Sequence, residues 1–193
     1  MAARGSYAKG IAKRDEILTT ALRVIAERGY RKTSLRELAA AVGLSQTGLL
    51  HYFGTKEDLF IAVLRKRDDV DTQTYIVEAG ETERINGFFN VIRHNADVPG
   101  LVHLYTQFSA EASEAEHPAH GYFQERSAYF RQIMVAAIQE DQDLGRLPAS
   151  LDADGIALLM LAASDGLQSQ WLLDSTVDMQ AHLSLLWDSL TRA

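Results

Sequence analysis

Residues 33–59 decide the fold prediction, and they read TSLRELAAAVGLSQTGLLHYFGTKEDL. The apolar residues from Leu35 to Val42 have the three-and-four spacing of a short amphipathic helix. Ser34 stands just before that helix and Glu37 follows three residues later, which is the pattern of a capping box. The stretch therefore predicts a helix that begins at about residue 35.

A second short helix is predicted after a tight turn. Two helices that cross steeply need a small residue where they touch and a turn residue that tolerates a positive φ, and Ala39 and Gly43 meet these needs. Ser45 is placed to cap the second helix, which runs to about Tyr52. The pattern is typical of a helix-turn-helix, whose second helix is free to enter a DNA groove. A plain helical hairpin has the same spacing and is the alternative.

The charges of the chain are divided unequally. The whole chain has a formal net charge of −7. Residues 1–67 hold 13 Lys and Arg against six Asp and Glu, a net charge of +7, and residues 68–193 hold six against 20, a net charge of −14. A basic segment of this kind favours a polyanionic partner, although an unevenly charged solvated surface is the alternative. The predicted helix-turn-helix lies inside the basic segment, which favours DNA.

Helical periodicity continues through the rest of the chain, and no alternating strand pattern is present. We expect an all-α fold of about nine helices. The first carries the apolar stripe from Ile17 to Ile25 and ends at Gly29, and the fourth is capped by Thr55. Five more are expected at about residues 81–95, 101–113, 122–145, 153–173 and 177–190.

Composition excludes several classes of protein. The chain has no cysteine, so disulfides, thiolate metal sites and cysteine nucleophiles are excluded. No apolar stretch approaches the roughly 18 residues of a membrane span, and the basic N-terminus lacks the apolar core of a signal peptide. We expect a cytoplasmic protein without a membrane partner.

Three segments of this region, Thr33–Ala39, Val42–Ser45 and Leu49–Leu59, resemble the DNA-binding domain of the TetR family of bacterial repressors. The resemblance covers about residues 12–65 and beyond them is limited to the number and order of helices. It implies an N-terminal three-helix domain with the helix-turn-helix, followed by a C-terminal helical domain for ligand binding and dimerisation. The expected division is a flexible basic arm at 1–11, a DNA-binding domain at 12–56 and an effector-binding and dimerisation domain at 57–193.

The resemblance also implies nine residues that contact double-stranded DNA. Gln46 and Thr47, at the exposed start of the second helix, are candidates for reading base edges, since Gln can pair with adenine. Lys56 and the two serines lie at helix N-termini, where phosphate oxygens are favoured. Leu50 departs from the family pattern, in which Tyr is common. The nine residues are Ser34, Arg36, Ser45, Gln46, Thr47, Leu50, His51, Tyr52 and Lys56.

The last two helices carry apolar stripes that favour a homodimer. These stripes comprise Ile156, Leu159, Met160, Ala163, Gly166 and Leu167 on one helix and Leu183, Leu186, Trp187 and Leu190 on the other. Paired with their copies they would form a four-helix bundle that sets two recognition helices about 34–36 Å apart. The core of a monomer is the alternative explanation.

The middle helices offer aromatic and polar residues for a small-molecule effector of unknown identity. A cavity between bundle helices with such a lining suits a mostly apolar ligand with a few hydrogen-bonding groups. The candidate residues are Phe88, His103, Tyr105, Phe108, Tyr129, Met134 and Trp171. For any single aromatic residue of this set, a place in a hydrophobic core is the more common explanation.

The alternative class is a metal-binding or hydrolytic helical enzyme. His117 and His120, near Glu111, Glu114 and Glu116, form the one cluster that resembles metal ligands, but Pro118 argues against a shared helical face. No phosphate loop or nucleophile motif occurs, so we expect no catalytic residue, metal or cofactor. The sequence favours a DNA-binding transcriptional regulator, a repressor that a small molecule releases from a palindromic operator. A ligand-free architectural DNA binder would leave the acidic domain without a role.

Overall fold

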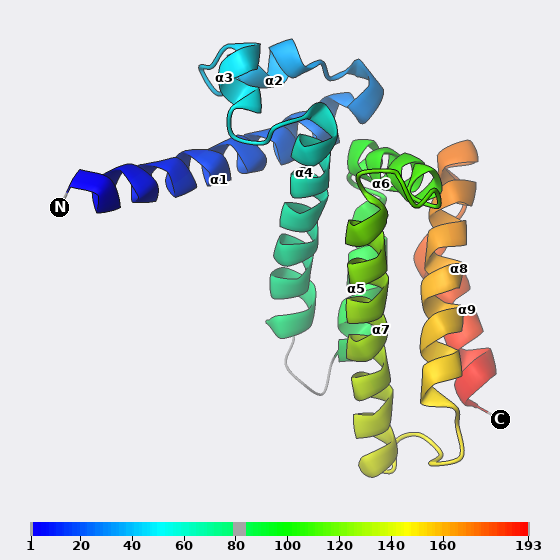
Figure 1. The fold of residues 1–193 in the computed structure, drawn as a ribbon. Helices are drawn as coiled ribbons and strands as arrows, with labels where there is room; N and C mark the ends of the chain where they lie inside the picture. The colour runs from blue at the N-terminus through cyan, green and yellow to red at the C-terminus, as the bar shows by residue number, and fades with distance from the viewer. Residues whose placement is uncertain (1, 79–83, 193) are drawn as a thin grey trace.

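The computed structural model of the chain describes residues 2–78 and 84–192, which form nine α-helices and no strand (Figure 1). The all-α prediction is confirmed. None of the described helices has the length and apolar character needed to cross a bilayer. The helices are α1 (Ala2–Arg28), α2 (Leu35–Ala41), α3 (Gln46–Leu50), α4 (Lys56–Asp71), α5 (Arg84–Asn95), α6 (Pro99–Glu111), α7 (His120–Asp143), α8 (Ala153–Leu173) and α9 (Met179–Thr191).

Two short helical segments of other types complete the chain. The 3-10 segment η1 (Tyr30–Lys32) joins α1 to α2, and the π-helical segment η2 (Thr72–Val77) continues directly from the end of α4. Gly29, which follows α1, has φ +83°, so the predicted helix end at that glycine is confirmed. A π-helical turn inside a longer helix often occurs at a functional site.

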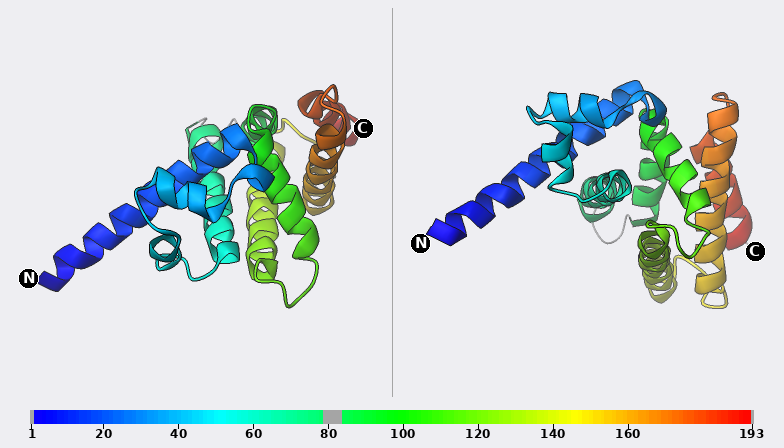
Figure 2. Two further views of the ribbon diagram at one scale, coloured as in Figure 1. Left: turned by 90° about the horizontal axis from the view of Figure 1, so that it is seen from above. Right: turned by 45° about the horizontal axis from the view of Figure 1, so that its top comes forward.

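The segment expected to form a flexible basic arm, residues 1–11, is helical where the structure describes it, because α1 begins at Ala2 and runs without a break through residues 2–11 (Figure 2). No proline interrupts this segment, and its Ala, Arg and Lys are strong helix formers that offset Gly5 and Gly10, so the helix extends toward the N-terminus. Arg4 belongs to residues 2–7, whose side chains lie outside the described part of the structure. In the views of Figures 1 and 2, α1 projects from the side of the molecule opposite α8 and α9.

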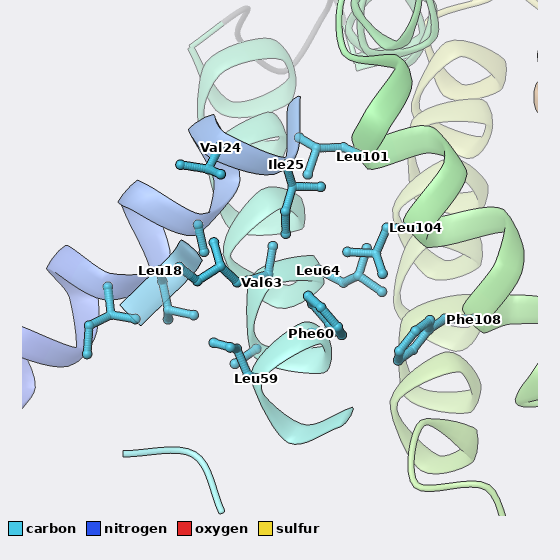
Figure 3. Close-up of a cluster of buried hydrophobic side chains, with 14 of the residues drawn as sticks. Leu18, Val24, Ile25, Leu59, Phe60, Val63, Leu64, Leu101, Leu104 and Phe108 are labelled. Atoms are coloured by element: carbon cyan, nitrogen blue, oxygen red, sulfur yellow. The ribbon is translucent and has the colours of Figure 1, made fainter. Parts of the chain in front are cut away.

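One hydrophobic core joins the N-terminal helices to α6. Figure 3 shows Ile25 of α1, Phe60 and Leu64 of α4, and Leu104 and Phe108 of α6 facing one another. All five side chains are buried. The free energy gained by burying this apolar surface is the main contribution that holds the helix-turn-helix region on the body of the protein.

A second core is formed by α5, α7, α8 and α9. Ile138, Met160 and Leu183 are completely buried in it. Phe89 of α5 packs edge-on against Trp187 of α9, with ring centroids 6.4 Å apart. The protein is therefore built around two cores, and α6 contributes to both, with Leu104 in the first and Val102 in the second.

Candidate nucleic-acid interface and interior cavity

The turn between α2 and α3 has the geometry that the sequence predicts. Gly43 has φ +69°. Ser34 forms the predicted capping box, in which the Glu37 amide donates to Ser34 Oγ at 3.2 Å and the Ser34 amide donates to Glu37 Oε2 at 2.8 Å. Ser45 caps α3, because its Oγ accepts from the Gly48 amide at 3.0 Å. These local bonds fix the two helices relative to the turn.

The two capping serines are not equivalent as phosphate contacts. Ser34 Oγ also donates to Glu37 Oε2 at 2.8 Å, so its hydroxyl is already used within the capping box. These hydrogen bonds lower the pKa of Glu37 and keep its carboxylate charged. Ser45 Oγ only accepts from Gly48, which leaves its proton for an external acceptor. Of the two, Ser45 is therefore the better phosphate donor.

The outer face of α3 is open to solvent. Gln46, Thr47 and His51 are exposed, whereas Leu50 and Tyr52 are half-buried. Leu49 is fully buried beneath them and anchors the helix to the N-terminal core. The exposed residues can reach a DNA groove, and Leu50 and Tyr52 can contribute only the edges of their side chains.

Lys56 and Arg36 are exposed at the edges of this face. Lys56 is the first residue of α4, and Thr55 before it forms a second capping box with Asp58. The Lys56 Nζ atom lies 5.5 Å from the centre of the Phe60 ring, which orients the side chain without neutralising its charge. An ammonium group at a helix N-terminus suits a phosphate oxygen.

Helix α1 supports the helix-turn-helix through two basic residues. Lys13 Nζ donates to the backbone oxygen of Val42 at 2.9 Å, which ties α1 to the end of α2. The Arg14 guanidinium lies 4.8 Å from the centre of the Phe53 ring. Lys13 and Arg14 closely follow the expected basic arm of residues 1–11, and these contacts give both side chains a place in the fold.

An interior cavity of about 330 Å³ lies between α4, η2, α5, α6, α7 and α8. Its apolar wall consists of Ile76, Phe88, Val91, Ile92, Phe123, Phe130 and Leu161, and its polar wall includes Arg67, Asp68, Asp71, Asn95, Tyr105, Arg126, Asp165 and Gln168. This size and mixed lining are characteristic of a small-molecule site.

Two hydrogen-bonded groups cross the polar wall. In the first, Arg126 Nε donates to both Asp68 oxygens at 3.0 Å, and Tyr122 Oη donates to Asp68 Oδ2 at 2.6 Å. Arg126 Nη1 also donates to Tyr105 Oη at 3.0 Å, and this hydroxyl donates to Asp165 Oδ1 at 2.8 Å. Burial raises the pKa of Tyr105 and Tyr122, so both phenols stay protonated as donors.

The second group is centred on Arg67, which is only 8% exposed to solvent. Its Nη1 donates to the Leu101 oxygen at 3.3 Å, its Nη2 donates to Asn95 Oδ1, and its Nε lies 3.4 Å from Asp71 Oδ2. Asn95 Nδ2 in turn donates to Gln168 Oε1 at 3.4 Å. Arg67 thereby links α4, α5 and α6 at one end of the cavity, and Asn95 extends the link to α8.

Known proteins resemble this chain in the N-terminal region that contains the helix-turn-helix. A family model described as bacterial regulatory proteins, tetR family, matches residues 17–63. The chain is 28% identical over 156 residues to the transcriptional repressor KstR2 of Mycobacterium tuberculosis H37Rv. The match covers 74% of this chain and 73% of KstR2. The chain is also 44% identical over 59 residues to the transcriptional regulator RutR of Escherichia coli K12. This match covers 31% of this chain and 28% of RutR.

The match to a solved structure extends over nearly the whole fold. A TetR-family transcriptional regulator from Rhodococcus sp. superposes with a TM-score of 0.72 at 25% identity, covering 93% of this chain and 98% of the other. Residues 17–63 thus form a DNA-binding region of the TetR family, and the chain as a whole has the fold of a TetR-family regulator. The predicted class, a DNA-binding transcriptional regulator, is confirmed, and the matched relatives are named as regulators rather than enzymes.

Two of the seven residues predicted to contact an effector, Phe88 and Tyr105, line the cavity. The other five do not. Phe108 packs edge-on against Tyr30 and Phe60 in the N-terminal core, and Trp171 and Met134 are buried in the second core. Tyr129 is 52% exposed on the outer side of α7, and His103 is half-buried on α6 away from the cavity wall.

Sequence reasoning missed the charged residues of the cavity, although α4 carried a signal for two of them. Phe60, Leu64, Arg67 and Asp71 follow one another at helical spacing along one face of α4, and all four are buried. Charged residues that continue an apolar stripe are rarely buried unless they are paired or bind a ligand. That pattern could have indicated the site before the fold was known.

The two histidines of the enzyme alternative have local structural roles. His117 Nδ1 accepts from the Ala119 amide at 3.2 Å, its Nε2 lies 3.5 Å from Glu111 Oε2, and its ring packs edge-on against Phe108. His120 Nδ1 lies 2.7 Å from the Ala112 oxygen. Within the described residues no three potential ligands are grouped to hold a metal ion. The comparisons do not favour the enzyme alternative.

Proposed function

We propose that this TetR-family regulator is a homodimeric repressor that leaves a palindromic operator when a small molecule fills the interior cavity. The observation that carries the proposal is the course of α4. Phe60 and Leu64 fix its first half in the core that holds the helix-turn-helix, while Arg67 and Asp71 in its second half line the cavity. A ligand that displaces the second half therefore moves the first.

We propose the same residues for DNA contact that the sequence indicated, with distinct roles. Gln46 and Thr47 read base edges, because they are exposed at the start of α3. Ser45 and Lys56 bind phosphate. Ser34, Arg36, His51, Tyr52 and Leu50 flank this centre and fix the register on the backbone.

The proposed division of the chain places DNA binding in residues 12–56 and effector binding and dimerisation in 57–193. The hydrophobic packing crosses this boundary, since α4 and α6 of the second domain also contribute side chains to the N-terminal core. The helix-turn-helix is therefore a module that depends on the larger domain for part of its core.

The proposed dimer interface is the outer face of α8 and α9. Ile156, Met160 and Leu183 of the predicted stripes are buried in the subunit's own core, but Leu158, Leu159 and Leu185 are 48%, 51% and 66% exposed. Helix α8 runs lengthwise along the body, and α3 lies near one end of the molecule (Figure 1). A two-fold axis parallel to α8 would set both α3 helices at the same end, as a palindromic site requires.

Selection of bound fragments from a random pool of double-stranded DNA tests the proposal. The expected result is a palindrome whose half-sites are about 10 base pairs, one helical turn, or a multiple of this apart. Recovery of unrelated sequences without a common palindrome would contradict it.

A further inference from the structure

The chemical class of the effector can be argued from the charges that line the cavity. Three carboxylates, those of Asp68, Asp71 and Asp165, face two guanidinium groups, those of Arg67 and Arg126. With all five groups ionised the wall carries one excess negative charge. The question is which of these groups the protein leaves available to a ligand.

Neither arginine offers its charge to a ligand. Arg126 is held by both oxygens of Asp68 at 3.0 Å, and its guanidinium lies 4.6 Å from the ring centres of both Tyr105 and Phe130. Arg67 directs its donors to the Leu101 oxygen, Asn95 Oδ1 and Asp71. A carboxylate or phosphate ligand would have to displace these internal partners.

The carboxylates are engaged unequally. Asp68 accepts from Arg126 and from the Tyr122 hydroxyl, so its charge is compensated. Asp71 is only 8% exposed and has one ion pair, in which its Oδ2 lies 3.4 Å from Arg67 Nε. Within the described residues its Oδ1 accepts no hydrogen bond. A buried carboxylate with an unused oxygen on a cavity wall is a strong acceptor for a ligand donor.

Asp165 adds a second acceptor. It accepts from two neutral donors, Tyr105 Oη at 2.8 Å and Gln168 Nε2 at 3.5 Å. Solvent reaches Asp165 in the single chain, so its charge is screened more than that of Asp71. Asp71 is therefore the primary candidate, and Asp165 strengthens the negative potential of the wall.

The pKa values of the charged residues in the cavity wall are consistent with a deficit of positive charge there. Burial raises the pKa of Asp71 more than Arg67 and the other nearby charges lower it. Burial opposes the charge of Arg126, yet the surrounding tyrosines and aspartates hold its pKa above the usual value. A ligand that brings one positive charge would relieve this imbalance.

We propose that the effector is a small organic monocation whose ammonium group pairs with Asp71 and whose apolar body lies against Phe88 and Phe123. This inference rests on the proposed function, because it assigns the effector to the same cavity. The volume of about 330 Å³ lies near the lower limit for ligand sites, which selects a small molecule. The aromatic rings of the wall favour a cation over an anion as well.

Calorimetry with three probes of similar shape tests the charge preference on the full chain. The probes are 2-phenylethylammonium, neutral 2-phenylethanol and anionic 3-phenylpropanoate. We expect the cation to bind about tenfold or more tightly than the alcohol, since an ion pair with Asp71 replaces a hydrogen bond from a neutral hydroxyl, and the anion to bind least. Equal affinities, preference for the anion, or no binding of any probe at millimolar concentration would overturn the inference.

Two variants assign the preference to residues. Asp71→Asn keeps the shape of the side chain and should abolish the preference for the cation over the alcohol. Asp165→Asn should reduce the preference in part, and it serves as the test if Asp71→Asn does not fold. The matched control is Asp154→Asn, an exposed residue of α8 outside the cavity that pairs with Arg131. A preference unchanged in both cavity variants would contradict the inference.

Failure of the inference is distinguishable from failure of the proposed function. Release of labelled operator DNA is measured separately, by fluorescence anisotropy with each probe at saturation. A cation that binds through Asp71 but leaves DNA bound would contradict release by a cavity ligand and preserve the charge assignment. Release of DNA by the alcohol or the anion in preference to the cation would contradict the charge assignment and preserve release by a cavity ligand.

Discussion

Gly100 of α6 lies against the backbone oxygen of Ile25 in α1, so closely that a methyl group at position 100 would be 1.9 Å from that oxygen. The same methyl would lie 2.8 Å from the Cα atom of Gly29. Helix α6 also carries Tyr105 into the cavity wall. The start of α6 is thus held against the end of α1 while its middle forms part of the cavity, which gives a second mechanical link beside α4.

Gly100→Ala should lower the free energy of unfolding by about 1–3 kcal/mol, because a backbone contact cannot yield without moving α6 away from α1. Gly121→Ala is the control, since this glycine of α7 has no atom within 4 Å of the added methyl and the change should stabilise the helix by up to about 1 kcal/mol. Urea denaturation measures both. Equal effects at the two positions would show that the close contact is unimportant.

Lys56→Ala should weaken binding to all DNA sequences and reduce the slope of log K against log salt by about one unit, because one phosphate contact is lost. Arg146→Ala is the control, since Arg146 lies in the α7–α8 connection, at the end of the body away from α3 (Figure 1). Titrations at several salt concentrations measure the slopes. An unchanged slope for Lys56→Ala would remove Lys56 from the interface.

Gln46→Ala should weaken binding to the selected operator by about 1–3 kcal/mol and have little effect on random DNA, because a bidentate contact to a base edge carries sequence information. His51→Ala should weaken both by a similar amount, as expected of a backbone contact. Competition binding with operator and random duplexes separates the two roles. Equal losses for Gln46→Ala on both duplexes would make it a backbone contact.

Tyr122→Phe should lower the free energy of unfolding by about 1.5–3 kcal/mol, because Asp68 loses a hydrogen bond of 2.6 Å to its charged carboxylate. Tyr129→Phe is the matched change about two helical turns further along α7, at a side chain that is 52% exposed, and it should alter stability by less than about 0.5 kcal/mol. Thermal or urea unfolding compares them. If Tyr122→Phe is as stable as wild type, the Asp68 network does not stabilise the fold.

Leu159→Glu and Leu185→Glu should convert the proposed dimer to a folded monomer, since both side chains are exposed on the single chain and become buried only between subunits. Leu144→Glu, at a residue 58% exposed beyond the end of α7, should leave the dimer intact. Light scattering gives the mass of each variant. A wild-type monomer at micromolar concentration would contradict the proposed interface.

The helix-turn-helix could be predicted in detail because its signals are local. The caps at Ser34, Ser45 and Thr55 and the positive φ of Gly43 depend on residues at most three positions apart. The end of α1 was equally predictable at Gly29. Only its start was missed, because basic residues without an apolar stripe indicate an arm as readily as a helix.

The cavity could not be predicted residue by residue, because neighbouring aromatics on one helix face different cores. Phe88 lines the cavity while Phe89 packs on Trp187, and Tyr105 lines it while Phe108 packs on Phe60. Which side of α5 or α6 faces the cavity depends on how the helices cross, and the sequence does not state this. The buried charges on α4 were the one signal that did not depend on the crossing angles.

The affinity of the wild-type protein for DNA as a function of salt concentration tests DNA recognition through α3 and Lys56 most directly. Counterion release from several phosphate contacts predicts a steep negative slope of log K against log salt, despite the net charge of −7 on the chain. A slope near zero would contradict DNA binding by this face.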